Sequence, residues 1–177
     1  MGRSFAAVDA ALPPGARIYV CHPAGPLSLT FGSAFVERWR LHQTLVWVKD
    51  QMMLGRSDYQ YKHEPILYGH KPARARIGRG GRGWFSGNSE VSVLEVTRPK
   101  ASREHPTMKP PELVEICVQN SSAAGDVVLD PFAGSGSTLV ACERAHRRAR
   151  LVELDPRYCH VIVARYERLT GEATERL

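Results

Sequence analysis

The feature that most constrains the fold is a short apolar run that ends in an acidic residue and continues into a glycine turn. Residues 125–138 read GDVVLDPFAGSGST, and their apolar part is typical of a strand covered on both faces. Asp130 follows at the carboxyl end of this expected strand, where open α/β sheets bind their ligands. Gly134 and Gly136 leave room beside the backbone, and Ser137 suits the start of a helix whose free N–H groups favour acceptor-rich ligands. The segment predicts an α/β fold with a cradle for a nucleotide-type cofactor.

A second acidic residue, Glu153, comes 23 positions after Asp130 (153 − 130) and closes residues 149–153, which we expect to be the next strand. This spacing is typical of a carboxylate that binds ribose hydroxyls. A dinucleotide motif would have a third glycine at Leu139, so a mononucleoside such as S-adenosylmethionine fits better than a pyrophosphate. The alternative is that the glycines only form a tight turn and that Glu153 is a solvated strand end.

Three segments resemble cofactor motifs of the amino-group DNA methyltransferases, which methylate N6 of adenine or N4 of cytosine. Residues 130–138 are similar to that family's S-adenosylmethionine motif. Residues 153–158, ELDPRY, resemble the motif whose Glu holds the ribose. Residues 105–110, HPTMKP, resemble a further cofactor motif, with Met108 where the family usually has Gln.

The resemblance implies that S-adenosylmethionine is the cofactor and that residues of these three motifs hold it. The residues are His105, Thr107, Lys109, Asp130, Pro131, Phe132, Gly134, Ser135, Gly136, Thr138 and Glu153. For the HPTMKP segment, the alternative is that its prolines only fix a loop and start a helix, which we expect at 112–120.

A fourth resemblance involves residues 47–49, 55–59 and 63–68, which are similar to the family's antiparallel hairpin beside the target-base pocket. Because this hairpin precedes the cofactor motifs, the resemblance implies the permuted β-class arrangement. It also implies a Rossmann-like sheet of order 3-2-1-4-5-7-6 with strand 7 antiparallel, of which this chain supplies strands 1, 2, 5, 6 and 7 but not 3 and 4. An equally open interpretation of the polar hairpin residues is a solvated turn, or an ion pair such as His63 with Glu64.

The family's catalytic tetrapeptide, Asp/Asn/Ser-Pro-Pro-Tyr/Phe/Trp, does not occur in residues 1–177, so no catalytic residue is assigned. That tetrapeptide accepts hydrogen bonds from the amino group of a flipped base and orients its lone pair for in-line displacement. We therefore expect a rearranged sheet, a second chain or copy that supplies the missing strands, or one piece of a longer enzyme. The function implied is a site-specific DNA amino-methyltransferase. The alternatives are an inactive remnant that binds the cofactor or DNA, and a methyltransferase for RNA or a small molecule.

The net charge of +6 is unevenly distributed along the chain. Residues 71–104 contain eight Lys or Arg, three Glu and several glycines, which predicts an irregular basic surface loop. Arginines in such a loop are suited to phosphates and guanine edges, and aromatic residues to stacking. We therefore expect double-stranded DNA as the partner and the following residues as its contacts: Arg56, Arg74, Arg76, Arg79, Arg82 and Trp84. The alternative is a flexible solvated insertion.

We expect a single methyltransferase domain with a sheet half at 1–70, the basic loop at 71–104 and a cofactor half at 105–177. A helix is expected at 4–12, a strand at 16–21 and a final helix from about 156 to 169. No apolar run approaches the roughly 20 residues that cross a bilayer, so we expect a cytoplasmic protein without membrane contact. The four cysteines form no Cys-x-x-Cys pair, and no metal site is expected.

Overall fold

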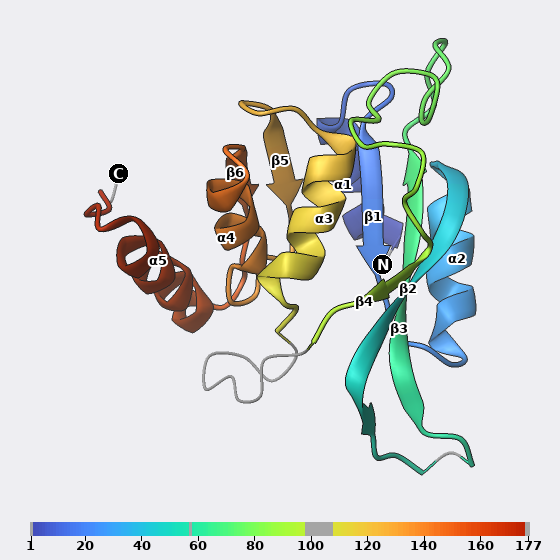
Figure 1. Ribbon diagram of the computed structural model, residues 1–177, viewed down its shortest axis with the longest axis horizontal. Helices are drawn as coiled ribbons and strands as arrows, with labels where there is room; N and C mark the ends of the chain where they lie inside the picture. Colours follow the sequence, from blue (N-terminus) through green and yellow to red (C-terminus); the bar gives the residue numbers. More distant parts are fainter. Residues whose placement is uncertain (1, 57, 98–107, 176–177) are drawn as a thin grey trace. The chain divides into compact units, whose positions relative to one another are not determined.

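A computed structural model describes residues 2–56, 58–97 and 108–175 of the chain (Figure 1). The chain divides into two units, Met1–Thr97 and Arg98–Leu177. Each unit contains its own sheet and its own helices, and each is described by itself below.

The first unit contains a four-stranded sheet of order β1-β3-β2-β4. The strands are β1 (Arg17–Cys21), β2 (Arg40–Met53), β3 (Tyr61–His70) and β4 (Val93–Glu95). Strand β3 runs antiparallel to both β1 and β2, and β4 is parallel to β2. The expected hairpin is therefore confirmed, and the order β1-β3-β2 matches the order 5-7-6 that the resemblance implied.

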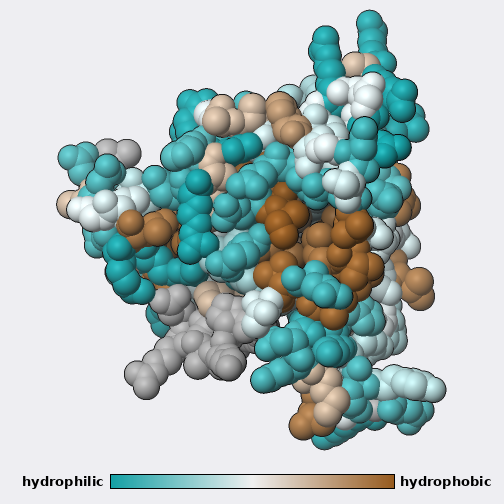
Figure 2. Space-filling view, viewed as in Figure 1, coloured by the Kyte–Doolittle hydropathy of each residue, from teal (hydrophilic) through white to brown (hydrophobic). Residues whose placement is uncertain are grey.

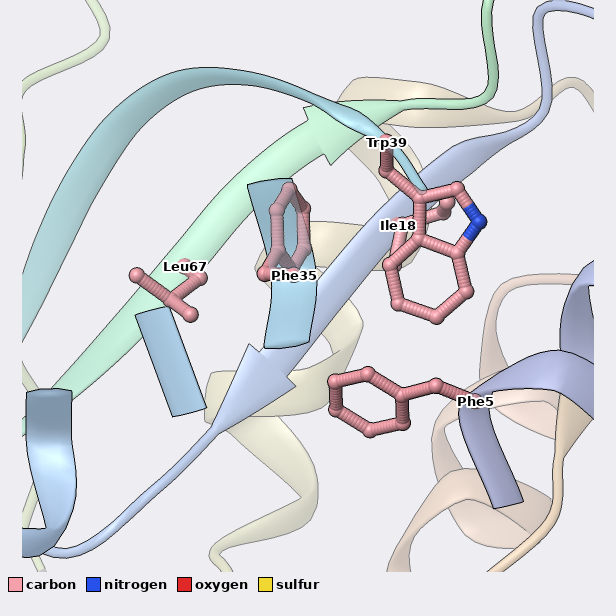
Figure 3. Close-up of a cluster of buried hydrophobic side chains, with 5 residues drawn as sticks. All are labelled: Phe5, Ile18, Phe35, Trp39 and Leu67. Atoms are coloured by element: carbon pink, nitrogen blue, oxygen red, sulfur yellow. The ribbon is translucent and has the colours of Figure 1, made fainter. Parts of the chain in front are cut away.

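Two helices, α1 (Gly2–Ala11) and α2 (Leu27–Val36), supply side chains to the core of this unit. The buried cluster, shown in Figure 3, consists of Phe5, Ile18, Phe35, Trp39 and Leu67. The Trp39 indole nitrogen donates to Asp9 Oδ1 at 2.8 Å, so this buried aromatic ring keeps its hydrogen bond. The sequence predicted α1 but not α2, whose segment LSLTFGSAFV carries no charged residue and is bounded by no clear helix signal.

The second unit contains two parallel strands, β5 (Val127–Asp130) and β6 (Arg148–Leu151). Its helices are α3 (Pro111–Ser121), α4 (Ser137–Arg144) and α5 (Pro156–Thr170). The buried cluster of Val118, Cys142 and Ala145 joins α3 to α4. The expected strand-turn-helix unit is thus confirmed. Helix α5 begins where predicted, but none of its side chains is buried, so it does not form the apolar cover that the sequence suggested.

No described helix is both long and apolar enough to span a membrane. Among the described residues, no cluster of three or more His, Cys, Asp or Glu side chains is placed to bind a metal ion.

Candidate functional site

The glycine turn between β5 and α4 adopts a backbone conformation that only glycine adopts readily. Gly134 has φ 53° and Gly136 has φ 81°, both in the left-handed region. Gly136 is also the residue that precedes the first turn of α4. A Cβ atom at Gly136 would lie 3.0 Å from Cγ1 of Ile162 on α5. Both the backbone and the packing therefore require glycine at this position.

Asp130, at the end of β5, holds the turn and the start of α4 together. Its Oδ1 accepts from the Phe132 backbone N–H at 3.0 Å, and its Oδ2 accepts from the Thr138 hydroxyl at 2.5 Å. Thr138 is buried. The structure thus gives Thr138, predicted as a cofactor contact, the role of a partner to Asp130.

Glu153, just after β6, bonds directly to the same turn. Its Oε2 accepts from the Gly134 backbone N–H at 2.7 Å, and its Oε1 accepts from the Asp155 backbone N–H at 2.9 Å. The hydrogen bond from Asp155, followed by that from Gly134, lowers the pKa of the Glu153 carboxyl, and partial burial opposes this effect. The carboxylate is therefore ionised at neutral pH, and each oxygen keeps a lone pair for a ligand hydroxyl. The structure brings together the two acidic residues that the sequence paired.

Arg165 on α5 is a residue of this site that the sequence reasoning missed. Its Nη1 donates to the Ser135 carbonyl oxygen at 2.7 Å and lies 3.3 Å from the Ser135 hydroxyl. The same atom lies 3.5 Å from the sulfur of Met108. Ile162 and Arg165 are three residues apart on one helix face, and this spacing was the available signal. Arg165 joins the glycine turn to the loop before α3.

The segment before α3 is described only from Met108 onward. Lys109 offers its backbone carbonyl, which accepts from the Ser137 hydroxyl at 2.6 Å. His105 and Thr107, both predicted to hold the cofactor, lie outside the described residues. The described contact supports the joining of this segment to the turn by the main chain of Lys109.

Three large apolar side chains near these carboxylates in the sequence are solvent-exposed. Phe132 is 64% exposed, Val152 58% and Leu154 96%. Pro131, beside Phe132, is partly buried. Exposed apolar side chains next to oriented acceptors are typical of a ligand site. The arrangement suits a molecule with hydroxyl groups and a flat apolar part.

In the first unit, the basic loop between β3 and β4 forms a compact turn. The Gly78 N–H donates to the Arg82 carbonyl, and the Arg82 N–H donates to the Arg76 carbonyl, each at 3.0 Å. Arg17, the first residue of β1, holds this loop by donating to the carbonyls of Gly83, at 2.9 Å, and Arg82. The predicted DNA contacts of this loop are all exposed, namely Arg74, Arg76, Arg79 and Arg82. Figure 2 shows hydrophilic side chains projecting where Figure 1 draws this loop.

The structure separates Arg56 from those four arginines. Arg56 lies between β2 and β3, beyond the Met53–Tyr61 pair, whereas the basic loop begins after His70 at the other end of β3. A strand of this length spans about 30 Å at 3.3 Å per residue. The two ends of the sheet therefore present separate basic groups.

The aromatic and charged hairpin residues also have defined partners. The Trp84 indole N–H donates to the Gly87 carbonyl at 3.0 Å, and its ring lies 6.3 Å from that of Tyr68, so Trp84 packs over the sheet. Lys49 is almost fully buried and pairs with Glu64 at 2.6 Å. The Glu64 carboxylate thus has a lysine as an ion partner, where the sequence had suggested His63.

Together, the parallel β5–β6 pair, the glycine turn and the two carboxylates define a Rossmann-like protein with a nucleotide-type cofactor site. The model of the DNA methylase family N6_N4_Mtase matches residues 29–164, and the chain belongs to this family. The resemblance of the motifs is therefore confirmed.

The chain is similar to two type II methyltransferases. It is 31% identical to M.XycI of Xanthomonas campestris pv. cyanopsidis over 145 residues, which cover 76% of this chain and 46% of the relative. It is 41% identical to M.Cfr9I of Citrobacter freundii over 147 residues, which cover 77% and 46%. The chain thus spans about half the length of the curated relatives that it matches.

The fold is similar to that of TTHA0409, a DNA modification methylase from Thermus thermophilus solved in complex with S-adenosyl-L-methionine. The TM-score is 0.74 at 26% identity, over 97% of this chain and 77% of that one. The expected Rossmann-like methyltransferase fold is confirmed.

Proposed function

We propose that this chain is the cofactor-binding part of an S-adenosylmethionine-dependent DNA methyltransferase that acts on N6 of adenine or N4 of cytosine. Membership of the N6_N4_Mtase family supports the class of reaction. The two relatives described above are named type II methyltransferases, which supports a site-specific DNA substrate. The observation that carries the proposal is the Glu153 carboxylate, hydrogen-bonded to the N–H of Gly134 within the glycine turn.

The residues of the turn fit the chemistry of S-adenosylmethionine. The free lone pairs of Glu153 suit two ribose hydroxyls, and the exposed Phe132 and Leu154 suit a purine face. Gly134 and Gly136 leave the backbone accessible, and Arg165 holds the turn in place. When bound, S-adenosylmethionine supplies a sulfonium methyl group for transfer. The part of this chain is to bind and orient the donor.

Titration calorimetry with S-adenosylmethionine tests this proposal. We expect the wild-type chain to bind, and Glu153→Ala to bind at least about tenfold more weakly because one charge-assisted hydrogen bond contributes about 1.5–3 kcal/mol. Glu143→Ala, on an exposed position of α4, is the matched control and should bind like the wild type. Equal affinity in both variants would exclude Glu153 as the ribose acceptor.

We further propose that a segment with the acceptor groups of the missing tetrapeptide pairs with β1. In the described structure β1 is an edge strand with β3 as its strand neighbour. An open edge presents unpaired N–H and C=O groups. The segment belongs either to a second chain or copy, or to a longer polypeptide that contains this sequence.

Co-expression with a fragment that carries Asp-Pro-Pro-Tyr and its strand tests this point. We expect labelled methyl transfer to DNA only when both pieces are present, and digestion to nucleosides then identifies N6-methyladenine or N4-methylcytosine. A chain that binds the donor yet gains no activity from such fragments would favour the second candidate, a binding protein without turnover. The sequence feature that favours this candidate is the absence of the tetrapeptide from residues 1–177.

A further inference from the structure

A hollow of about 330 Å³ lies in the first unit, outside the proposed donor site. It lies where the chain passes from β1 into α2, against β2 and β3. Its lining consists of His22, Ala24, Gly25, Ser28, Thr44, Tyr61, His63, Pro65 and Leu67. This lining includes three hydroxyl groups and two imidazoles, but no carboxylate. The hollow is therefore rich in donors and free of negative charge.

His22 is the residue that indicates a ligand. It is only 4% exposed, and its ring stacks on Phe31 with centroids 5.3 Å apart. Its Nδ1 lies 3.0 Å from the Pro23 carbonyl oxygen and must carry a hydrogen, because a carbonyl only accepts. Its Nε2 is buried and has no hydrogen-bond partner among the described residues. Buried polar atoms are rarely left unpaired, so this atom requires a partner.

The start of α2 adds a second feature that favours an anion. Pro26 precedes α2 and offers no side-chain cap, while Gly25 and Ser28 both line the hollow. The positive end of the helix dipole favours negative charge there. Gly25 also has φ 92°, and a Cβ atom on it would lie 2.9 Å from the Tyr61 hydroxyl oxygen. Glycine thus lets the Tyr61 hydroxyl lie over the beginning of the helix.

We infer that this hollow binds a phosphate group, and specifically a phosphodiester of the DNA substrate. This assignment rests on the proposed function, which supplies the DNA. His22 takes up a proton from solvent when the anion binds, so that Nε2 donates to a phosphate oxygen while Nδ1 keeps its bond to Pro23. The hydroxyls of Ser28 and Tyr61 donate to the remaining oxygens. The other titratable groups that line the hollow are Tyr61 and His63.

The first test uses inorganic phosphate and the full-length chain. Titration followed by NMR should shift the His22 imidazole resonances and show a second ring N–H. His160→Gln, at an exposed histidine of the second unit, is the control and should leave these shifts unchanged. An unchanged His22 spectrum at high phosphate concentration would overturn the site.

The second test measures binding of a fluorescent DNA duplex by anisotropy at pH 6 and pH 8. Tyr61→Phe keeps the ring and should weaken binding about threefold to tenfold, the effect of one lost hydrogen bond. His22→Gln should weaken binding at pH 6 and reduce the difference between the two pH values. His63→Gln should keep that difference, which separates the two imidazoles.

The outcomes also separate this inference from the proposed function. Donor binding, measured by calorimetry, should be unchanged in Tyr61→Phe and His22→Gln. If His22 responds to inorganic phosphate but both variants bind the duplex like the wild type, the DNA assignment is wrong and the hollow takes small phosphates. If His22→Gln does not fold, judged by circular dichroism, the phosphate titration and Tyr61→Phe still decide.

Discussion

The two units differ in how they satisfy their buried polar groups. In the described part of the second unit, no buried side-chain nitrogen or oxygen lacks a hydrogen-bond partner. In the first unit, four such atoms lack one and have no ion partner, and they belong to Arg17, His22, Tyr68 and His70. An unpaired buried polar group costs about 1–3 kcal/mol. The glycine turn is thus complete without a ligand, whereas the sheet of the first unit holds polar groups that a bound molecule or water would complete.

The turn is complete because its partners lie close together along the chain or across one strand pair. Asp130 bonds to Phe132, and Glu153 bonds to Asp155, in each case two residues away. Only the bond from Gly134 to Glu153 crosses to the neighbouring strand. A site built this way is ordered before its ligand arrives, which reduces the entropy cost of binding.

The largest expected effect breaks this pre-ordered turn. Gly136→Ala adds a left-handed backbone cost of about 1–2 kcal/mol and a close contact with Ile162 that costs about 1–3 kcal/mol more. Gly125→Ala is a matched control, because Gly125 has nearly the same φ, 82°, but open space around its Cβ position. Denaturant unfolding should show a larger loss of stability for Gly136→Ala than for Gly125→Ala. Equal losses would mean that the packing against α5 contributes nothing.

A smaller effect is expected at the link between α5 and the turn. Arg165→Met removes the hydrogen bond to the Ser135 carbonyl and should weaken donor binding about fivefold, since a bond from a charged group contributes about 1.5 kcal/mol. Arg168→Met, at an exposed arginine of the same helix, should have little effect. Arg165 acts as a positioning residue, so the affinity for the donor should change more than the unfolding midpoint. The reverse pattern would make Arg165 purely structural.

The contrast between local and distant contacts also explains what the sequence could predict. The apolar run, the strand-end Asp130 and the proline at Pro156 are local signals, and the elements they predicted are present. Arg165 and Ser135 are 30 residues apart, and no periodicity connects them. In the same way, Trp84 reads as an exposed base-stacking residue until the fold places it on Tyr68.

The basic loop shows a second limit of sequence-based prediction. Glycines and arginines at 74–83 predicted a surface loop, and the loop is there. The donation from Arg17 to Gly83 comes from a residue 66 positions earlier, so the sequence could not place the loop at the amino end of β1. Nor could it show that Arg56 lies at the other end of the hairpin. Grouping basic residues by sequence proximity therefore does not define a DNA surface.

Acid titration should distinguish the two units by the pH at which each loses stability. Burial, followed by the charges of His42, Arg17 and Arg40, lowers the pKa of His70. A neutral His70 is favoured in the folded state, so its contribution is present above the usual histidine pKa of about 6.5 and is lost as the pH falls below it. The lowered pKa of Glu153 gives a contribution that is lost only below about pH 4.5.

Tryptophan fluorescence reports on the first unit, because Trp39, Trp47 and Trp84 all belong to it. Its signal should begin to change between about pH 6.5 and 5. Donor binding should persist to lower pH than this change. His70→Phe should move the onset of the fluorescence change to lower pH, and an onset that stays in place would exclude His70 as the cause.

The smallest expected effect concerns the packing of the second unit. Burial raises the pKa of the Cys142 thiol to about 11, so almost no thiolate forms at pH 8. Cys159, on α5, is exposed. A thiol reagent at pH 8 should therefore modify Cys159 quickly and Cys142 only at the rate of local opening, read by peptide mass spectrometry. Because Cys142 packs in the α3–α4 cluster directly behind the turn, Gly136→Ala should accelerate its labelling while Gly125→Ala should not. Rapid labelling of Cys142 in the wild type would show that the region around the turn opens readily, and the contrast between the two units would then no longer hold.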